Sequence, residues 1–110
     1  MLNEFKYALK YYEYSESIYP NSSLVLYHKA NLLFQMGNND KSKEILLKLI
    51  DKNHKEAPLY ILLGRIYKSQ NNDKKALTQF QLASSLDQSK DIIIKNLINS
   101  LERRDDSIDI

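Results

Sequence analysis

The sequence predicts an all-α fold, a solenoid of helical repeats, and three observations lead to that prediction. The first is a self-match with a 34-residue period, which is typical of repeats built from two antiparallel helices. Its paired positions are Ala30 and Gly64, Leu33 and Tyr67, Ser42 and Ala76, Leu46 and Phe80, and Leu49 and Ala83. The second is that only two Gly and two Pro interrupt the 110 residues. The third is that apolar residues recur every three or four positions, as on one face of a helix.

Six helices follow from the breaks in this pattern. We expect them over 3–18, 23–36, 40–52, 57–70, 73–86 and 90–103. In repeat order they make a half repeat, two full repeats, a capping helix and an acidic tail, over 3–18, 23–56, 57–90, 91–104 and 105–110. Residues 1–104 are therefore predicted to form a single array.

The expected helix ends carry residues that stop or cap helices. Pro20 ends the first helix, and the Asn-Ser-Ser stretch at 21–23 supplies capping side chains for the second. Pro58 fits the first turn of its helix, where a missing N–H costs little. These residues support the predicted boundaries independently of the hydrophobic pattern.

Small residues are expected where the two helices of a repeat cross. Ala30 and Gly64 provide them from the first helices, and Ser42 and Ala76 from the second helices. A larger side chain there would push the helices apart. The large residues expected to fill the remaining volume are Tyr12, Leu46 and Phe80. All of these residues are predicted to be core and not site.

The first predicted helix has no partner preceding it in its own repeat. We expect Phe5, Tyr11 and Tyr14 to lie off the face that packs onto the following repeat. A cluster of exposed aromatic residues indicates a missing neighbour or a partner. The sequence therefore favours the C-terminal piece of a longer superhelix, and the alternative is self-association through residues 3–18.

Composition argues against several classes of function. The net charge of +2 gives no clustered basic stripe for nucleic acid, and no apolar run is long enough for a membrane span. There is no Cys, no Gly-rich phosphate loop and no signal peptide, and His28 and His54 lack metal-binding spacing. We therefore expect an intracellular protein that is not an enzyme and uses no cofactor, metal, nucleic acid or membrane.

The second repeat resembles the tetratricopeptide repeat. The matching residues are Tyr60, Leu63, Gly64, Tyr67, Ala76, Phe80 and Ala83. A more specific resemblance is carried by the stretches 28–34 and 59–68. It is also carried by Lys29, Phe34 and Leu49, which differ from the residues usual at their repeat positions, and by an Asp pair after the last helix. Over roughly residues 6–106 the chain resembles the last repeats of the tetratricopeptide subunit family of the anaphase-promoting complex, the cyclosome.

That resemblance implies a non-catalytic scaffold in a cell-cycle ubiquitin ligase of nucleus and cytoplasm. Its protein partners would be neighbouring repeat subunits and coactivator-like proteins whose C-terminal tails end in Ile-Arg. In such arrays the first helix of each repeat lines the groove, so the expected peptide-binding residues are Tyr27, His28, Asn31, Gln35, Ile61, Arg65 and Lys68. Asn31 and Arg65 are one repeat period apart and are expected side by side, to hold a peptide amide and the terminal carboxylate.

Other interpretations of the same residues stay open. Arg65 and Lys68 also fit ordinary solvated charges, and His28 fits a packed surface residue. No carboxylate lies on the predicted groove face of either repeat, so the partner for an incoming Arg is not visible. The alternative functions are a chaperone-adaptor clamp for acidic C-terminal tails and a purely structural assembly module.

Overall fold

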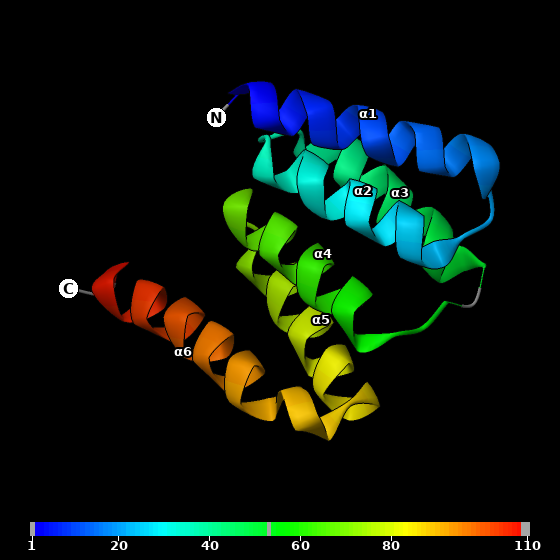
Figure 1. Cartoon of the computed structure of the whole chain (residues 1–110). Coiled ribbons are helices and arrows are strands. Elements are labelled where there is room, and N and C mark those ends of the chain that lie inside the picture. The colour runs from blue at the N-terminus through cyan, green and yellow to red at the C-terminus, as the bar shows by residue number, and fades with distance from the viewer. Residues whose placement is uncertain (1, 53, 109–110) are drawn as a thin grey trace. The chain divides into compact units, whose positions relative to one another are not determined.

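The structure, a computed structural model, describes residues 2–52 and 54–108 of the chain and is helical along most of their length (Figure 1). The helices are α1 Leu2–Ile18, α2 Ser23–Gln35, α3 Asn39–Asp51, α4 Ala57–Ser69, α5 Asp73–Leu86 and α6 Asp91–Ile108, with a 3₁₀ turn η1 at Gln88–Lys90. Two compact units divide the chain, unit 1 at Met1–His54 and unit 2 at Lys55–Ile110. The predicted all-α repeat fold is confirmed, whereas a single array over residues 1–104 stays a prediction.

Within each unit, helices that are neighbours in sequence pack on one another. In unit 1, α2 packs against both α1 and α3, and in unit 2, α5 packs against both α4 and α6 (Figure 1). The predicted helix boundaries agree with the structure to within about a residue for the first five helices.

Side-chain caps begin three of the helices, and the cap from the 21–23 stretch is the one that the sequence predicted. The Ser22 side chain accepts a hydrogen bond from the Val25 N–H at 3.3 Å. Asn38 and Asn72, which are one repeat period apart, cap α3 and α5 in the same way, by accepting from the N–H of Lys41 and of Lys75. Pro58 lies in the first turn of α4, as predicted.

The turns between the two helices of each repeat have the same backbone conformation in both repeats. Gly37 has φ +84° and Asn71 has φ +61°, and these are equivalent positions of the 34-residue period. Gly and Asn are the residues that most readily adopt this left-handed conformation after a helix. The turn therefore uses two different residues to reach one geometry.

The helix crossing in unit 1 uses two small buried residues and one backbone acceptor. Ala30 on α2 and Ser42 on α3 are both fully buried, and so is Leu46 one turn further along α3. The Ser42 hydroxyl donates a 2.6 Å hydrogen bond to the Ala30 carbonyl. That bond satisfies a polar group that would otherwise be costly to bury.

The crossing in unit 2 is closed by an aromatic ring. Gly64 on α4 faces Phe80 on α5, and Phe80 and Ala76 are fully buried. A Cβ atom added at Gly64 would meet three Phe80 ring atoms, the farthest of them at 3.0 Å. The ring therefore fills the space that a side chain at position 64 would need.

The C-terminal end differs from the expectation of a frayed acidic tail from residue 105. Helix α6 continues through residues 105–108, and residues 109–110 lie outside the described part of the chain. The physical reason is that no Gly or Pro follows Arg103 to stop the helix. On its packing face Ile94 and Leu101 are buried, whereas the neighbouring Ile93 is 48% exposed.

The 3₁₀ turn that leads into α6 has its own cap. The Asp87 carboxylate accepts hydrogen bonds from the Ser89 hydroxyl at 2.6 Å and from the Ser89 N–H at 3.0 Å. These bonds, the hydroxyl first, hold the pKa of Asp87 below its usual value. The Asp87 side chain therefore holds the turn that leads into α6.

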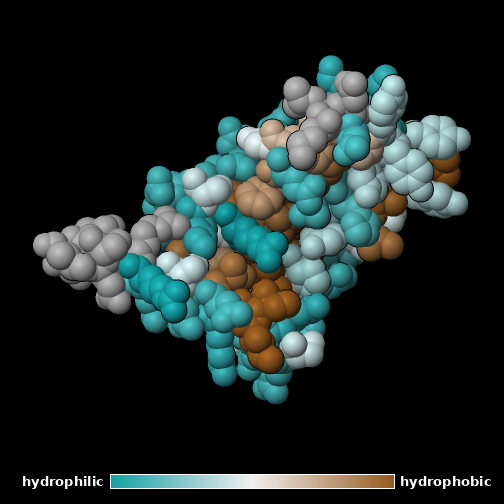
Figure 2. Space-filling view, turned by 60° about the vertical axis from the view of Figure 1, so that its left-hand side comes forward, coloured by the Kyte–Doolittle hydropathy of each residue, from teal (hydrophilic) through white to brown (hydrophobic). Residues whose placement is uncertain are grey.

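Large hydrophobic side chains also reach the surface, in patches that polar residues surround (Figure 2). On α1, Tyr7, Tyr11 and Tyr14 are all largely exposed, which agrees with the prediction for Tyr11 and Tyr14. In the part of the chain that the structure describes, no helix is both long and apolar enough to cross a membrane.

Candidate functional site

The seven residues predicted to bind a peptide fall on two helices, one in each unit. Tyr27, His28, Asn31 and Gln35 lie on α2, and Ile61, Arg65 and Lys68 lie on α4. The expected side-by-side placement of Asn31 and Arg65 stays a prediction.

Three of the α2 residues line one hollow between α1 and α2. Its volume is about 350 Å³, within the usual range of ligand pockets. The lining residues are Glu4, Phe5, Ala8, Tyr12, His28, Asn31, Leu32 and Gln35. We call this cavity the α1–α2 hollow; it combines an apolar wall with two amides, an imidazole and a carboxylate.

Aromatic rings hold the imidazole at the edge of the hollow. The His28 ring stacks on Tyr12 of α1, with 6.0 Å between ring centroids and 14° between ring planes. On its own helix Tyr27 meets the same ring at 5.5 Å and 55°. Tyr27 is half-buried and does not line the hollow, so its observed contact is with His28.

The carboxylate in the hollow is a residue that the sequence analysis missed. Glu4 is exposed and comes from the first turn of α1, one helical turn before Ala8. The sequence prediction covered only the groove faces of the two full repeats, and Glu4 precedes both of them. The available signal was its spacing, because residues four apart share a helix face, and Glu4, Ala8 and the predicted core residue Tyr12 follow one another at that spacing.

Phe5 corrects a second expectation. We predicted that it lies off the face of the first helix that packs onto the following repeat. The structure places it half-buried in the hollow, and in a neighbouring cavity with Gln35 and Met36 of α2. A Phe ring at the start of α1 removes apolar surface from water by turning toward α2.

The three predicted residues of unit 2 differ in exposure and in hydrogen bonding. Arg65 is exposed on α4, and Ile61 is half-buried. The Lys68 amine donates a 2.6 Å hydrogen bond to the hydroxyl of Ser100 on α6, and that hydroxyl donates to the Leu97 carbonyl at 2.7 Å. Lys68 is thus partnered within unit 2 and is less available to a peptide than Arg65.

Metal chemistry finds no support among the described residues. No group of three His, Asp or Glu side chains lies together there in a way that would hold an ion. The side chains that line the α1–α2 hollow offer apolar contact, amide groups for hydrogen bonds, an imidazole and one carboxylate.

Known proteins resemble this chain along most of its length. A family model for the tetratricopeptide repeat matches residues 24–51 and 57–90. Anaphase-promoting complex subunit 3 of Schizosaccharomyces pombe is 32% identical over 99 residues, which cover 90% of this chain and 15% of that protein. The subunit of the same name in Dictyostelium discoideum is 33% identical over 92 residues, covering 84% of this chain and 10% of that protein.

A solved structure resembles the fold as well. The crystal structure of a tetratricopeptide repeat protein from Parabacteroides merdae has a TM-score of 0.83 and 25% sequence identity, covering 93% of this chain and 40% of that one. The resemblances stated from the sequence are thereby confirmed. This chain spans only a small part of the subunit 3 relatives.

Proposed function

The chain belongs to the tetratricopeptide repeat family, and on that premise we propose that it is a scaffold of an anaphase-promoting complex that docks C-terminal protein tails. Its likeness to subunit 3 proteins over 84% to 90% of its own length supports membership of that complex. The α1–α2 hollow supports tail docking and is the observation that carries the proposal. Such a scaffold is an interaction module and not a catalyst.

The side chains of the hollow match the chemistry of an Ile-Arg tail. The apolar wall of Phe5, Ala8 and Leu32 suits the Ile side chain. Glu4 supplies the carboxylate that a guanidinium pairs with best. The amides of Asn31 and Gln35 can hold peptide N–H and C=O groups.

The terminal carboxylate of the tail needs a cation or a donor. Within the hollow the His28 imidazole can donate an N–H. Arg65, which is exposed on α4 of unit 2, stays a separate prediction and is not part of the hollow. Lys68 is left out of the proposed site because its amine already bonds Ser100.

A fluorescence-anisotropy titration of the full chain tests this function. A labelled peptide ending in a free Ile-Arg is compared with the same peptide amidated at its C-terminus and with an acidic double-carboxylate tail. We expect saturable binding of the free Ile-Arg tail alone. Preference for the acidic tail would replace the proposal with a chaperone-adaptor clamp, and binding of none would leave a structural assembly module.

Single substitutions test whether the tail binds in the α1–α2 hollow. Because charge-assisted hydrogen bonds contribute about 1.5–3 kcal/mol, Glu4→Lys is expected to weaken tail binding by about tenfold or more. Asn31→Ala should weaken it by a smaller factor. Glu13→Lys is the matched control, since Glu13 is an exposed carboxylate of α1 outside the hollow. Equal effects of Glu4→Lys and Glu13→Lys would show that only overall charge matters.

A further inference from the structure

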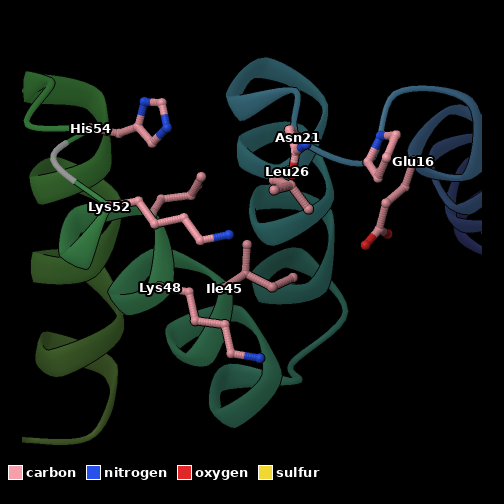
Figure 3. A pocket seen from close by; sticks show the side chains of 9 residues that line it. Glu16, Asn21, Leu26, Ile45, Lys48, Lys52 and His54 are labelled. Atoms are coloured by element: carbon pink, nitrogen blue, oxygen red, sulfur yellow. The ribbon is translucent and has the colours of Figure 1, made fainter.

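A second cavity of unit 1 lies apart from the α1–α2 hollow and shares no residue with it. Its volume is about 360 Å³, and it lies where the chain enters α2 and where α3 ends (Figure 3). The lining residues are Glu16, Pro20, Asn21, Leu26, Ile45, Lys48, Leu49, Lys52 and His54. We call it the basic pocket.

The floor of the basic pocket is apolar. Leu26 of α2 and Ile45 of α3 are both half-buried, and Leu49 of α3 is buried beside them. Figure 3 labels both Leu26 and Ile45 among the side chains that line the cavity. A half-exposed aliphatic floor gains free energy when a large apolar side chain covers it, at about 25 cal/mol per Å².

Two lysines and a histidine also line the basic pocket. Lys48 and Lys52 line it from α3, and Figure 3 shows the Lys52 chain extending toward Leu26 and Ile45. His54 adds an imidazole, and its backbone N–H donates a hydrogen bond to the Leu49 carbonyl at 3.1 Å, which fixes the chain at this point. The pocket therefore presents donors above a surface that favours apolar contact.

These cations are only weakly neutralised within the chain. The one carboxylate of the lining, Glu16, is paired with Lys29 at 2.8 Å. Lys48 pairs with Glu44 at 3.3 Å, but the two side chains are 71% and 64% exposed, and such pairs contribute little. Among the described residues no ion pair to Lys52 is found.

Comparison with the second repeat shows that the positive charge is not required by the fold. The positions one repeat period after Lys48, Lys52 and His54 hold Leu82, Leu86 and Gln88. Leu82 and Leu86 are 42% and 46% exposed, so nothing in the packing demands a cation there. The basic character thus belongs to the first repeat and is not set by the repeat fold.

We propose that the basic pocket binds an acidic peptide segment in which one large apolar side chain is flanked by carboxylates. The apolar side chain covers Leu26, Ile45 and Leu49, and the carboxylates accept from Lys48 and Lys52. This site is independent of the proposed tail docking, because the two cavities have different residues and opposite charge requirements.

The test is an anisotropy titration of the full chain with a labelled internal peptide. The probe carries a single Phe between runs of Asp and Glu, and its C-terminus is amidated so that the tail site is not engaged. We expect saturable binding that weakens with added salt and that weakens about tenfold or more in Lys52→Glu. Lys48→Glu should weaken it further in combination.

A control variant and two control peptides distinguish this proposal from a general attraction between the lysines and any polyanion. Lys41→Glu is the control variant, because Lys41 is an α3 lysine outside the pocket. A second peptide has Gly in place of the Phe, and a third has Asn and Gln in place of the acids. No saturable binding, equal loss in Lys41→Glu and Lys52→Glu, or equal binding of the Gly peptide would each overturn the proposal.

The same titration followed by nitrogen-15 NMR shows where on the chain the acidic peptide binds. Amide shifts are expected at Leu26, Ile45 and Lys52 and not at Asn31 or Gln35. Shifts confined to the α1–α2 hollow would overturn the basic pocket while leaving the tail proposal intact. A failed tail titration would leave the basic pocket untouched, so the two proposals fail separately.

Discussion

The crossing of α2 with α3 and that of α4 with α5 occupy equivalent positions of the 34-residue period, yet they are closed differently. Unit 1 uses Ala30 with Leu46, and it adds the hydrogen bond from Ser42 to a backbone carbonyl. Unit 2 uses Gly64 with the larger Phe80, and Ala76 stands where Ser42 stands in unit 1. A repeat thus conserves the summed volume at its crossing and not the individual residues.

Breaking the crossing of unit 2 is expected to have the largest effect. Gly64→Leu places a branched side chain where a Cβ alone already meets the Phe80 ring. Since Phe80 is fully buried and has no free space to enter, we expect a loss of about 3 kcal/mol or more of unfolding free energy. Urea denaturation followed by circular dichroism measures it. A cost below about 1 kcal/mol would show that the ring moves easily.

Converting the crossing of unit 2 into that of unit 1 sharpens the comparison. Gly64→Ala alone should cost about 1–3 kcal/mol, because the clash outweighs the better helix propensity of Ala. Adding Phe80→Leu reproduces the Ala30–Leu46 pair and should recover part of that cost. The control is Phe80→Leu by itself, which loses volume beside a Gly and should destabilise. Additive single effects in the double variant would contradict volume conservation.

Removing the Ser42 hydroxyl from the crossing of unit 1 is expected to have a smaller effect on the free energy of unfolding. Ser42→Ala deletes the 2.6 Å bond to the Ala30 carbonyl and gives unit 1 the residue that unit 2 has. We expect a loss of about 1 kcal/mol, seen as a lower urea midpoint. Ser85→Ala is the control, because the Ser85 hydroxyl also donates to a backbone carbonyl, that of Leu82 at 2.7 Å, but within its own helix and at an exposed site. If Ser42→Ala costs no more than this control, the buried bond adds nothing to the crossing.

The turns should show the smallest difference. Gly37→Ala forces Ala into φ +84° with open space around its Cβ, so only backbone strain opposes it, at about 1 kcal/mol. Asn71→Ala, at φ +61°, replaces a residue that itself tolerates this region imperfectly. Its cost, by thermal denaturation, should therefore be lower than that of Gly37→Ala. A reversed order would mean that the Asn71 side chain, and not its backbone, holds the turn.

Local sequence rules predicted the fold because each repeat contains its own stop, cap and crossing residues. Ser22, Pro58 and the 34-residue pairing of Ala30 with Gly64 act over short distances, so a sequence pattern is sufficient to find them. The end of α6 was predicted too early because acidic residues suggested a tail, although no helix breaker is present. Polarity alone does not end a helix.

The candidate site was predicted only in part because it is built from two helices. Periodicity placed His28, Asn31 and Gln35 on one face of α2, and these three line the hollow. Which residues of α1 meet that face depends on how the helices pack, so Glu4 was missed and Phe5 was assigned to the wrong side. Lys68 found an acceptor on α6 that no local pattern reveals.

A nitrogen-15 NMR titration with the free Ile-Arg peptide tests tail docking in the hollow most directly. We expect saturable shifts at Glu4, His28, Asn31 and Gln35, and none when the peptide is amidated. The amides of α3 around Lys48 and Lys52 should stay in place, because they belong to the other cavity. Saturable shifts that leave those four residues unmoved would contradict docking between α1 and α2.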